Sequence, residues 1–237
     1  GVLGGMGPMA TVYFYNLLVE HTIAKKDSDH IDVVISGRAT TPDRAAYIVN
    51  DTDSSPLDVL SKDLKSLIHY GANVIASPCN TAHYFYDSLK LIDTDVHILD
   101  MIQESVNLLK SLGARSVGIM ATRGTIRSRL YQKECRQSGI TPHIPNDEIQ
   151  KLITKMIYKH IKAGKDVDIE DFNKAVYYFE GLKCEYIILG CTELSLLRKP
   201  LDLDDSYIDP LEVLVYRSIV ECGKQPVGFS EAFEFMK

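Results

Sequence analysis

Two stretches decide the fold: NVIASPCNTAH at residues 73–83 and YIILGCTEL at residues 186–194. Each begins with a short apolar run of the length expected for a buried strand, and each run leads to a cysteine, Cys79 or Cys191. Small hydroxyl or amide residues and then a helical pattern follow each cysteine. The two stretches therefore predict a pair of strand–turn–helix units with a thiol at each turn.

The rest of the chain alternates short apolar runs with longer amphipathic ones. This alternation predicts an α/β fold in which helices flank mostly parallel strands. The expected strands lie at residues 2–3, 31–36, 74–76, 117–120 and 186–189. The expected helices begin near residues 8, 56, 101, 147, 169 and 210, and one more ends at Ser138.

The two halves of the chain share this layout. The glycine turns at Gly7 and Gly124 are 117 positions apart, and the two cysteines are 112 positions apart. We therefore expect two pseudo-symmetric lobes, one formed by residues 1–100 with 209–237 and the other by residues 101–208. Ligands of parallel α/β sheets bind at the carboxyl ends of the strands, so we expect the active site in the cleft between the lobes.

Composition excludes several classes of protein. The 237 residues are 45% hydrophobic and carry a net charge of −6 without a basic cluster, which argues against nucleic-acid binding. No apolar run approaches the roughly 18 residues that span a bilayer, and no signal peptide is visible. Five cysteines without a short-spaced framework indicate free thiols in a reducing cytoplasm. The chain begins at Gly1 without methionine, so we expect a few leading residues to be missing.

The paired thiols suggest proton transfer. A helix N-terminus favours negative charge and so favours a thiolate. One thiolate can remove a proton from a carbon while a thiol on the opposite face donates one, which inverts the stereocentre without a cofactor. The alternative is that the cysteines are small buried apolar side chains, which is what we expect of Cys135, Cys184 and Cys222.

Groups that bind anions accompany the cysteines. Hydroxyl and amide side chains stand at expected helix starts, where they can bind a carboxylate or simply cap the helix. They are Asn80, Thr81, Thr122, Thr125 and Thr192. Arg44 and Lys165 can each bind a carboxylate, or they are solvated surface charges.

Two further side chains stand next to the cysteines. His83 lies four residues after Cys79 and either orients that thiol or packs in the core. Glu193 can position the Cys191 thiol or a substrate ammonium, and its charge opposes a thiolate.

Other kinds of site find little support in the sequence. The glycines at residues 4, 5 and 7 lack the spacing of a dinucleotide-binding loop. Cys79 and His83 would supply only two metal ligands, so we expect no metal site. No Ser-His-Asp arrangement is recognisable, and neither cysteine belongs to a Cys-x-x-Cys redox pair.

Taken together, the motifs resemble the aspartate/glutamate racemase superfamily, and within it the cofactor-independent aspartate racemases. The matching segments occur in family order and span nearly the whole chain. They are residues 4–8, 42–44, 78–83, 121–125 and 190–194.

The resemblance implies a homodimer that acts on a small acidic amino acid without a cofactor. Cys79 and Cys191 would be the acid/base pair. The α-carboxylate would be held by Asn80, Thr81 and Thr192, and the side-chain carboxylate by Arg44 and Lys165. Thr122 and Thr125 would line the cleft, with Met6 and Glu193 also at the substrate.

Two positions favour the aspartate branch. Cell-wall glutamate racemases usually carry Asp-Ser after the first strand and His after the second Cys-Thr, where this chain has Met6-Gly7 and Glu193. Glutamate remains a possible substrate. The alternatives are a dicarboxylate isomerase or lyase of the same fold, such as a maleate isomerase, and a non-catalytic two-lobed protein that binds an acidic metabolite.

Overall fold

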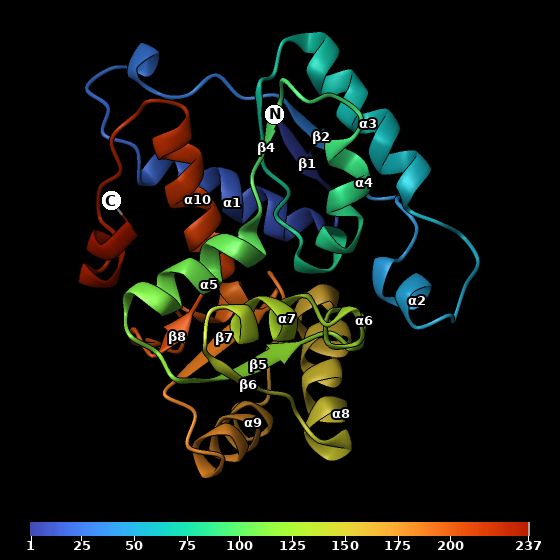
Figure 1. Cartoon of the computed structure of the whole chain (residues 1–237), viewed down its shortest axis with the longest axis vertical. Coiled ribbons are helices and arrows are strands. Elements are labelled where there is room, and N and C mark those ends of the chain that lie inside the picture. The colour runs from blue at the N-terminus through green and yellow to red at the C-terminus, as the bar shows by residue number, and fades with distance from the viewer. Residues whose placement is uncertain (237) are drawn as a thin grey trace.

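The computed structural model describes residues 1–236, which form two α/β lobes (Figure 1). In the first lobe, parallel strands follow the order β2-β1-β3-β4, with β1 and β3 joined by a bridge between Val2 and Ala76. The elements of the first hundred residues are β1 (Val2–Gly4), α1 (Pro8–Glu20), a 3₁₀ turn (Asp27–Asp29), β2 (Ile35–Gly37), α2 (Arg44–Ile48), α3 (Leu57–Tyr70), β3 (Val74–Ile75), a 3₁₀ helix (Asn80–Phe85), α4 (Tyr86–Lys90) and β4 (His97–Ile98).

The second lobe has a parallel sheet in the order β6-β5-β7-β8. The elements after residue 100 are α5 (Met101–Ser111), β5 (Ser116–Ala121), α6 (Arg123–Ser128), α7 (Leu130–Gln137), β6 (Thr141–His143), α8 (Asp147–Lys155), a π-helical turn (Met156–His160), a 3₁₀ turn (Ile161–Ala163), α9 (Ile169–Gly181), β7 (Tyr186–Gly190), a 3₁₀ helix (Leu194–Leu197), β8 (Tyr207–Ile208), α10 (Pro210–Glu221) and a 3₁₀ helix (Glu231–Met236).

The two strand orders are equivalent. In each order the second strand is the first of its lobe in the chain, and the third strand, β3 or β7, leads into a cysteine turn. This equivalence confirms the predicted pair of similar lobes with mostly parallel sheets. The exact residues at which one lobe gives way to the other stay a prediction.

Local sequence signals explain where the helices begin and end. Asp209 accepts a hydrogen bond from the backbone N–H of Leu211, and Pro210 occupies the first turn of α10. Asp100 caps α5 in the same way. At the other end, α3 stops at Gly71, whose φ of 107° lies in the left-handed region that glycine adopts readily.

One apolar core joins the lobes. Figure 1 shows α1 and α5 between the two sheets, with α10 packed beside them. Their buried side chains form a single cluster with residues of both sheets, including Val2 of β1 and Val117 of β5. Two further clusters cover the far face of each sheet. Continuous apolar packing therefore fixes the position of one lobe relative to the other.

Some expectations are corrected. The helix after each cysteine is a short 3₁₀ helix, and the predicted helix ending at Ser138 is divided into α6 and α7 at Arg129, whose φ is 60°. The strands β4, β6 and β8 and the short helix α2 were not predicted. Within residues 1–236, no helix combines the length and apolar character needed to cross a membrane. The cytoplasmic location and the homodimer stay predictions.

Candidate active site

Both cysteines line one small cavity, with a volume of about 20 Å³. Their turns have the same geometry, because the N–H of Cys79 donates to Ser77 O at 2.7 Å and the N–H of Cys191 donates to Leu189 O at 2.8 Å. The Cys79 and Cys191 residues are 5% and 6% exposed. The fold therefore brings the two cysteines to one cavity, as the sequence predicted.

Hydrogen bonds among three threonine hydroxyls join the two lobes beside the cavity. Thr81 Oγ1 lies 3.2 Å from Thr122 Oγ1 and 2.9 Å from Thr125 Oγ1. The lobes approach closely here because Gly124 has no side chain: a Cβ on Gly124 would lie 2.5 Å from Ala45 Cα. Thr81 and Thr122 line the cavity as predicted, whereas Thr125 lies behind them and supports their hydroxyls.

A cation stands next to Cys79. Arg44 begins α2 after the Asp43 cap, and its guanidinium donates to the carbonyl oxygens of Thr41, Pro42 and Met6 at 3.1–3.3 Å. Burial acts to lower the pKa of Arg44, but the neighbouring Cys79 and Asp43 outweigh it and the pKa is raised. Arg44 is thus firmly cationic and places a positive charge beside Cys79.

An acidic side chain stands next to Cys191. The thiol of Cys191 donates to Glu193 Oε2 at 2.9 Å, and Lys162 Nζ forms an ion pair with Glu193 Oε1. Burial and the Glu193 charge raise the pKa of Cys191 well above its ordinary value, although Lys162 acts in the opposite direction. Cys191 therefore favours its thiol form, in line with the expectation that the charge of Glu193 opposes a thiolate.

The second cation of the site is Lys162 rather than Lys165. Tyr158 and Lys162 both line the cavity, and they lie on the π-helical and 3₁₀ turns that extend α8. Lys165 lies beyond the left-handed Gly164, is exposed, and does not line the cavity. A short π-helical segment often marks a functional site because it changes which side chains face inward.

The remaining predicted residues also line the cavity. Met6, Asn80, Thr192 and Glu193 are all buried, and Thr192 Oγ1 donates to Pro78 O at 3.2 Å. The sequence reasoning missed Asp43, Ala45, Tyr158 and Lys162, which complete the lining. Tyr158 and Lys162 are four residues apart and so share one face of a helix, and this spacing was the sequence signal that could have identified them.

His83 supports the Cys79 turn from behind. Its Nδ1 lies 3.0 Å from Cys79 O, and its Nε2 accepts the backbone N–H of Met101 at 3.2 Å. Because Nε2 accepts a hydrogen bond, Nδ1 carries the proton and donates to the carbonyl. His83 therefore fixes the backbone of the turn to the start of α5 and does not contact the thiol through these bonds.

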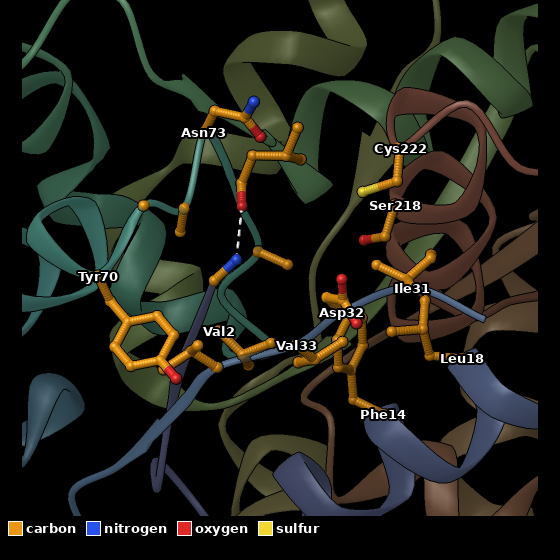
Figure 2. Close-up of a pocket in the computed structure, with 16 residues that line it drawn as sticks. Val2, Phe14, Leu18, Ile31, Asp32, Val33, Tyr70, Asn73, Ser218 and Cys222 are labelled. Carbon is orange, nitrogen blue, oxygen red and sulfur yellow. Dashed lines mark hydrogen bonds between the residues drawn. The ribbon is translucent and has the colours of Figure 1, made fainter. Parts of the chain in front are cut away.

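A larger cavity lies elsewhere and has a different character. Its volume is about 600 Å³, and Figure 2 shows Cys222 and Ser218 on one side and Tyr70 on the other. The backbone nitrogen of Gly1 borders it and donates to Val74 O at 2.7 Å. Among the described residues that line it there is no arginine, no lysine and neither site cysteine. Among the described residues it therefore has neither the cationic side chains nor the pair of thiols that line the small cavity.

The other three cysteines, Cys135, Cys184 and Cys222, do not line the small cavity. Burial raises the pKa of Cys135 to about 12 and that of Cys184 to about 11. It also raises the pKa of Cys222. Among residues 1–236, no three His, Cys, Asp or Glu side chains gather into a possible metal site.

Comparison with known proteins places the chain in a family. Residues 3–217 match the family model described as Asp/Glu/Hydantoin racemase. The match covers most of the chain, so the protein belongs to the Asp/Glu/hydantoin racemase family.

Three racemases resemble the chain over most of its length. The chain is 25% identical over 213 residues to the broad specificity amino-acid racemase RacX of Bacillus subtilis (strain 168), covering 88% of this chain and 91% of the relative. It superimposes on the aspartate racemase of Picrophilus torridus with a TM-score of 0.84 and 27% identity, covering 100% of this chain and 96% of that one. The glutamate racemase of Francisella tularensis, solved with D-glutamate, shares the fold at a TM-score of 0.66 and 20% identity, with 93% and 80% coverage.

Proposed function

We propose that this racemase interconverts L- and D-aspartate, with glutamate as a possible second substrate, by proton transfer between Cys79 and Cys191. The observation that carries the proposal is the shared cavity, in which equivalent turns of the two lobes bring both thiols together with two cations. The likeness to an aspartate racemase over the whole chain supports the choice of aspartate.

The surroundings of Cys191 suit it to act as the first proton donor. Burial and Glu193 raise its pKa well above the ordinary value, and Cys79, beside the cationic Arg44, is then the base in the proposal. In one direction the Cys79 thiolate removes the α-hydrogen as a proton and Cys191 donates its proton to the other face of the α-carbon. Cys191 is then the thiolate, and the reverse reaction returns the proton to it. The electron pair stays on the substrate throughout, so no redox partner is required.

The charges around the cavity suit a dicarboxylate. Arg44 and Lys162 supply two positive groups from opposite lobes. A carboxylate bound to either one is held by a charge-assisted hydrogen bond, and arginine can hold it with two. Because Lys162 is paired with Glu193, we expect the substrate carboxylate to compete with Glu193 for this cation.

The cavity must enlarge before an amino acid enters. A space of about 10–15 Å³ holds one water molecule by a comparable measure, so the cavity of about 20 Å³ is smaller than any amino acid. Lys162 and Glu193 form an ion pair at the cavity, and the Tyr158 ring, which also lines it, lies 6.0 Å from Lys162 Nζ. We therefore propose that opening moves the segment that carries Tyr158 and Lys162.

Isotope exchange tests the proposal. L- and D-aspartate are incubated separately with the reduced protein in deuterated buffer, and loss of the α-hydrogen and inversion are followed. Both should occur, and Cys79→Ser and Cys191→Ser should each abolish net racemisation. Absence of exchange with aspartate and glutamate would exclude the proposed activity. Turnover of maleate without aspartate would instead select a dicarboxylate isomerase, and tight binding without exchange would select a binding protein.

A further inference from the structure

One hydrogen bond between the lobes fixes the orientation of a side chain in the cavity. Tyr131, on α7, is 0% exposed, and its hydroxyl donates to Oδ1 of Asn80 at 2.5 Å. Asn80 follows Cys79 directly, lines the cavity and is 2% exposed. The other end of the same amide, Nδ2, is buried and has no hydrogen-bond partner among the described residues.

The length of the bond identifies the atoms that it joins. An O–H···O hydrogen bond spans about 2.5–3.0 Å, whereas an N–H···O bond spans about 2.7–3.2 Å, so 2.5 Å fits a hydroxyl that meets the amide oxygen. The other hydroxyl near Tyr131 is that of Ser105, and its own proton is donated to Met101 O at 2.5 Å. Ser105 therefore does not donate to Tyr131, and the hydrogen bond that the Tyr131 hydroxyl itself donates goes to Asn80.

An amide held by its oxygen presents its N–H₂ group in the other direction. A buried donor without a partner is unfavourable, because it has lost its hydrogen bonds to water. Such a donor at a cavity wall is matched by an acceptor on the molecule that the cavity binds. A carboxylate oxygen is the strongest acceptor that an amino acid offers, since it carries a negative charge.

We propose that Tyr131 is a positioning residue that holds the Asn80 amide so that Nδ2 donates to a substrate carboxylate. The proposal rests on the racemase activity proposed above. Tyr131 itself contacts no substrate, because it lies behind Asn80 and is absent from the lining of the cavity. Since Tyr131 and Asn80 come from different lobes, the amide takes this orientation only where the lobes are docked together.

The first experiment compares Tyr131→Phe with the wild-type protein. The variant keeps the buried ring and removes only the hydroxyl, so the amide is free to turn its oxygen toward the substrate. Carboxylate binding is present in the ground state and in the transition state, so we expect KM for aspartate to rise about tenfold while kcat changes less. Tyr178→Phe is the matched control: it also removes a hydroxyl bond, to Ile144 O at 3.3 Å, but lies away from the cavity. Its KM should stay within twofold of the wild-type value.

A double-mutant cycle separates positioning from a purely structural effect. If Tyr131 acts through Asn80, Tyr131→Phe should raise KM no further in an Asn80→Ala background. Independent, multiplicative effects of the two substitutions would overturn the proposal, as would an unchanged KM in Tyr131→Phe. If Tyr131→Phe fails to fold, Asn80→Asp gives the answer, because it retains an oxygen for Tyr131 and replaces the Nδ2 donor by a second oxygen. An unchanged KM in Asn80→Asp would contradict the proposal. A wild-type protein without exchange activity would refute the racemase function itself, before Tyr131 is tested.

Discussion

Replacing Lys162 tests the most important difference between the site read from the sequence and the site in the structure. Lys162→Met keeps most of the side-chain length and removes the charge. A hydrogen bond to a charged group contributes about 1.5–3 kcal/mol, which corresponds to a loss of about 10- to 150-fold in kcat/KM for aspartate. Lys165→Met is the matched control, because Lys165 is exposed and does not line the cavity.

The same substitution has a cost in stability. Glu193 is 6% exposed at its side chain and would lose its cation, whereas the Lys162 side chain is 28% exposed. Removing one partner of a buried pair costs about 3–5 kcal/mol, and partial exposure reduces this, so we expect about 2 kcal/mol. For a chain of this size that corresponds to a fall of about 4–8 °C in Tm. The exposed Lys165→Met should change stability by less than about 0.5 kcal/mol.

The assay is α-hydrogen exchange with L- and D-aspartate, together with thermal unfolding of each variant. A large loss of kcat/KM in Lys165→Met with normal kinetics in Lys162→Met would refute the assignment. So would an unchanged kcat/KM in Lys162→Met. Removal of the lysine charge also raises the pKa of Cys191 further, because Lys162 acts to lower it.

Three more substitutions test separate parts of the structure. Glu193→Gln removes the charge and the acceptor that help to raise the pKa of Cys191, so alkylation of Cys191 at pH 8 in a Cys79→Ser background should become faster; an unchanged or slower rate would contradict this. Gly124→Ala places a Cβ 2.5 Å from Ala45 Cα, so we expect the free energy of unfolding in denaturant to fall by about 1–3 kcal/mol and the activity to fall too. Gly181→Ala is the control: its Cβ meets open space at the end of α9, so the substitution should be neutral or stabilising. Burial and Asp209 raise the pKa of Glu212 to about 7, above its ordinary value. Between pH 4.5 and pH 7 the native state therefore keeps a proton that the unfolded state releases. The free energy of unfolding falls as the pH rises through this range. Glu212→Gln should therefore gain stability relative to wild type between pH 5 and pH 7.5 in urea titrations, and a gap that narrows as pH rises would count against this reasoning.

The two cysteine turns were predictable because their signals are local. A short apolar run that ends at Cys79 or Cys191 defines a strand and the residue that follows it, and parallel strands end at the same edge of a sheet. The near-equal spacing of equivalent turns in the two halves indicated similar lobes, and the equivalent strand orders confirm them. The strands β4, β6 and β8 escaped prediction because none of them lies in an apolar run as long as those that indicated β5 and β7.

The second cation was misplaced because its role depends on distant contacts. In the sequence Lys162 is one of several lysines near the end of a helix, and Lys165 follows a glycine that suggests a loop near a site. Only the packing of the turns after α8 against the second cysteine turn brings Lys162 to Glu193. The protonation of Cys191 had the same origin: the sequence showed Glu193 beside it, but the burial that raises its pKa comes from the surrounding fold.

The sequence by itself determined the α/β class, the two similar halves and the identities of the paired thiols, because each follows from residues close together in the chain. The tertiary structure alone decided which cation stands beside which thiol, that Tyr131 fixes the Asn80 amide, and that the cavity is nearly closed. The physical reason is that charge, desolvation and hydrogen-bond direction act through space over a few ångströms. Lys162 and Glu193 are 31 residues apart in the chain and Tyr131 and Asn80 are 51 apart, so these groups meet only when the chain folds.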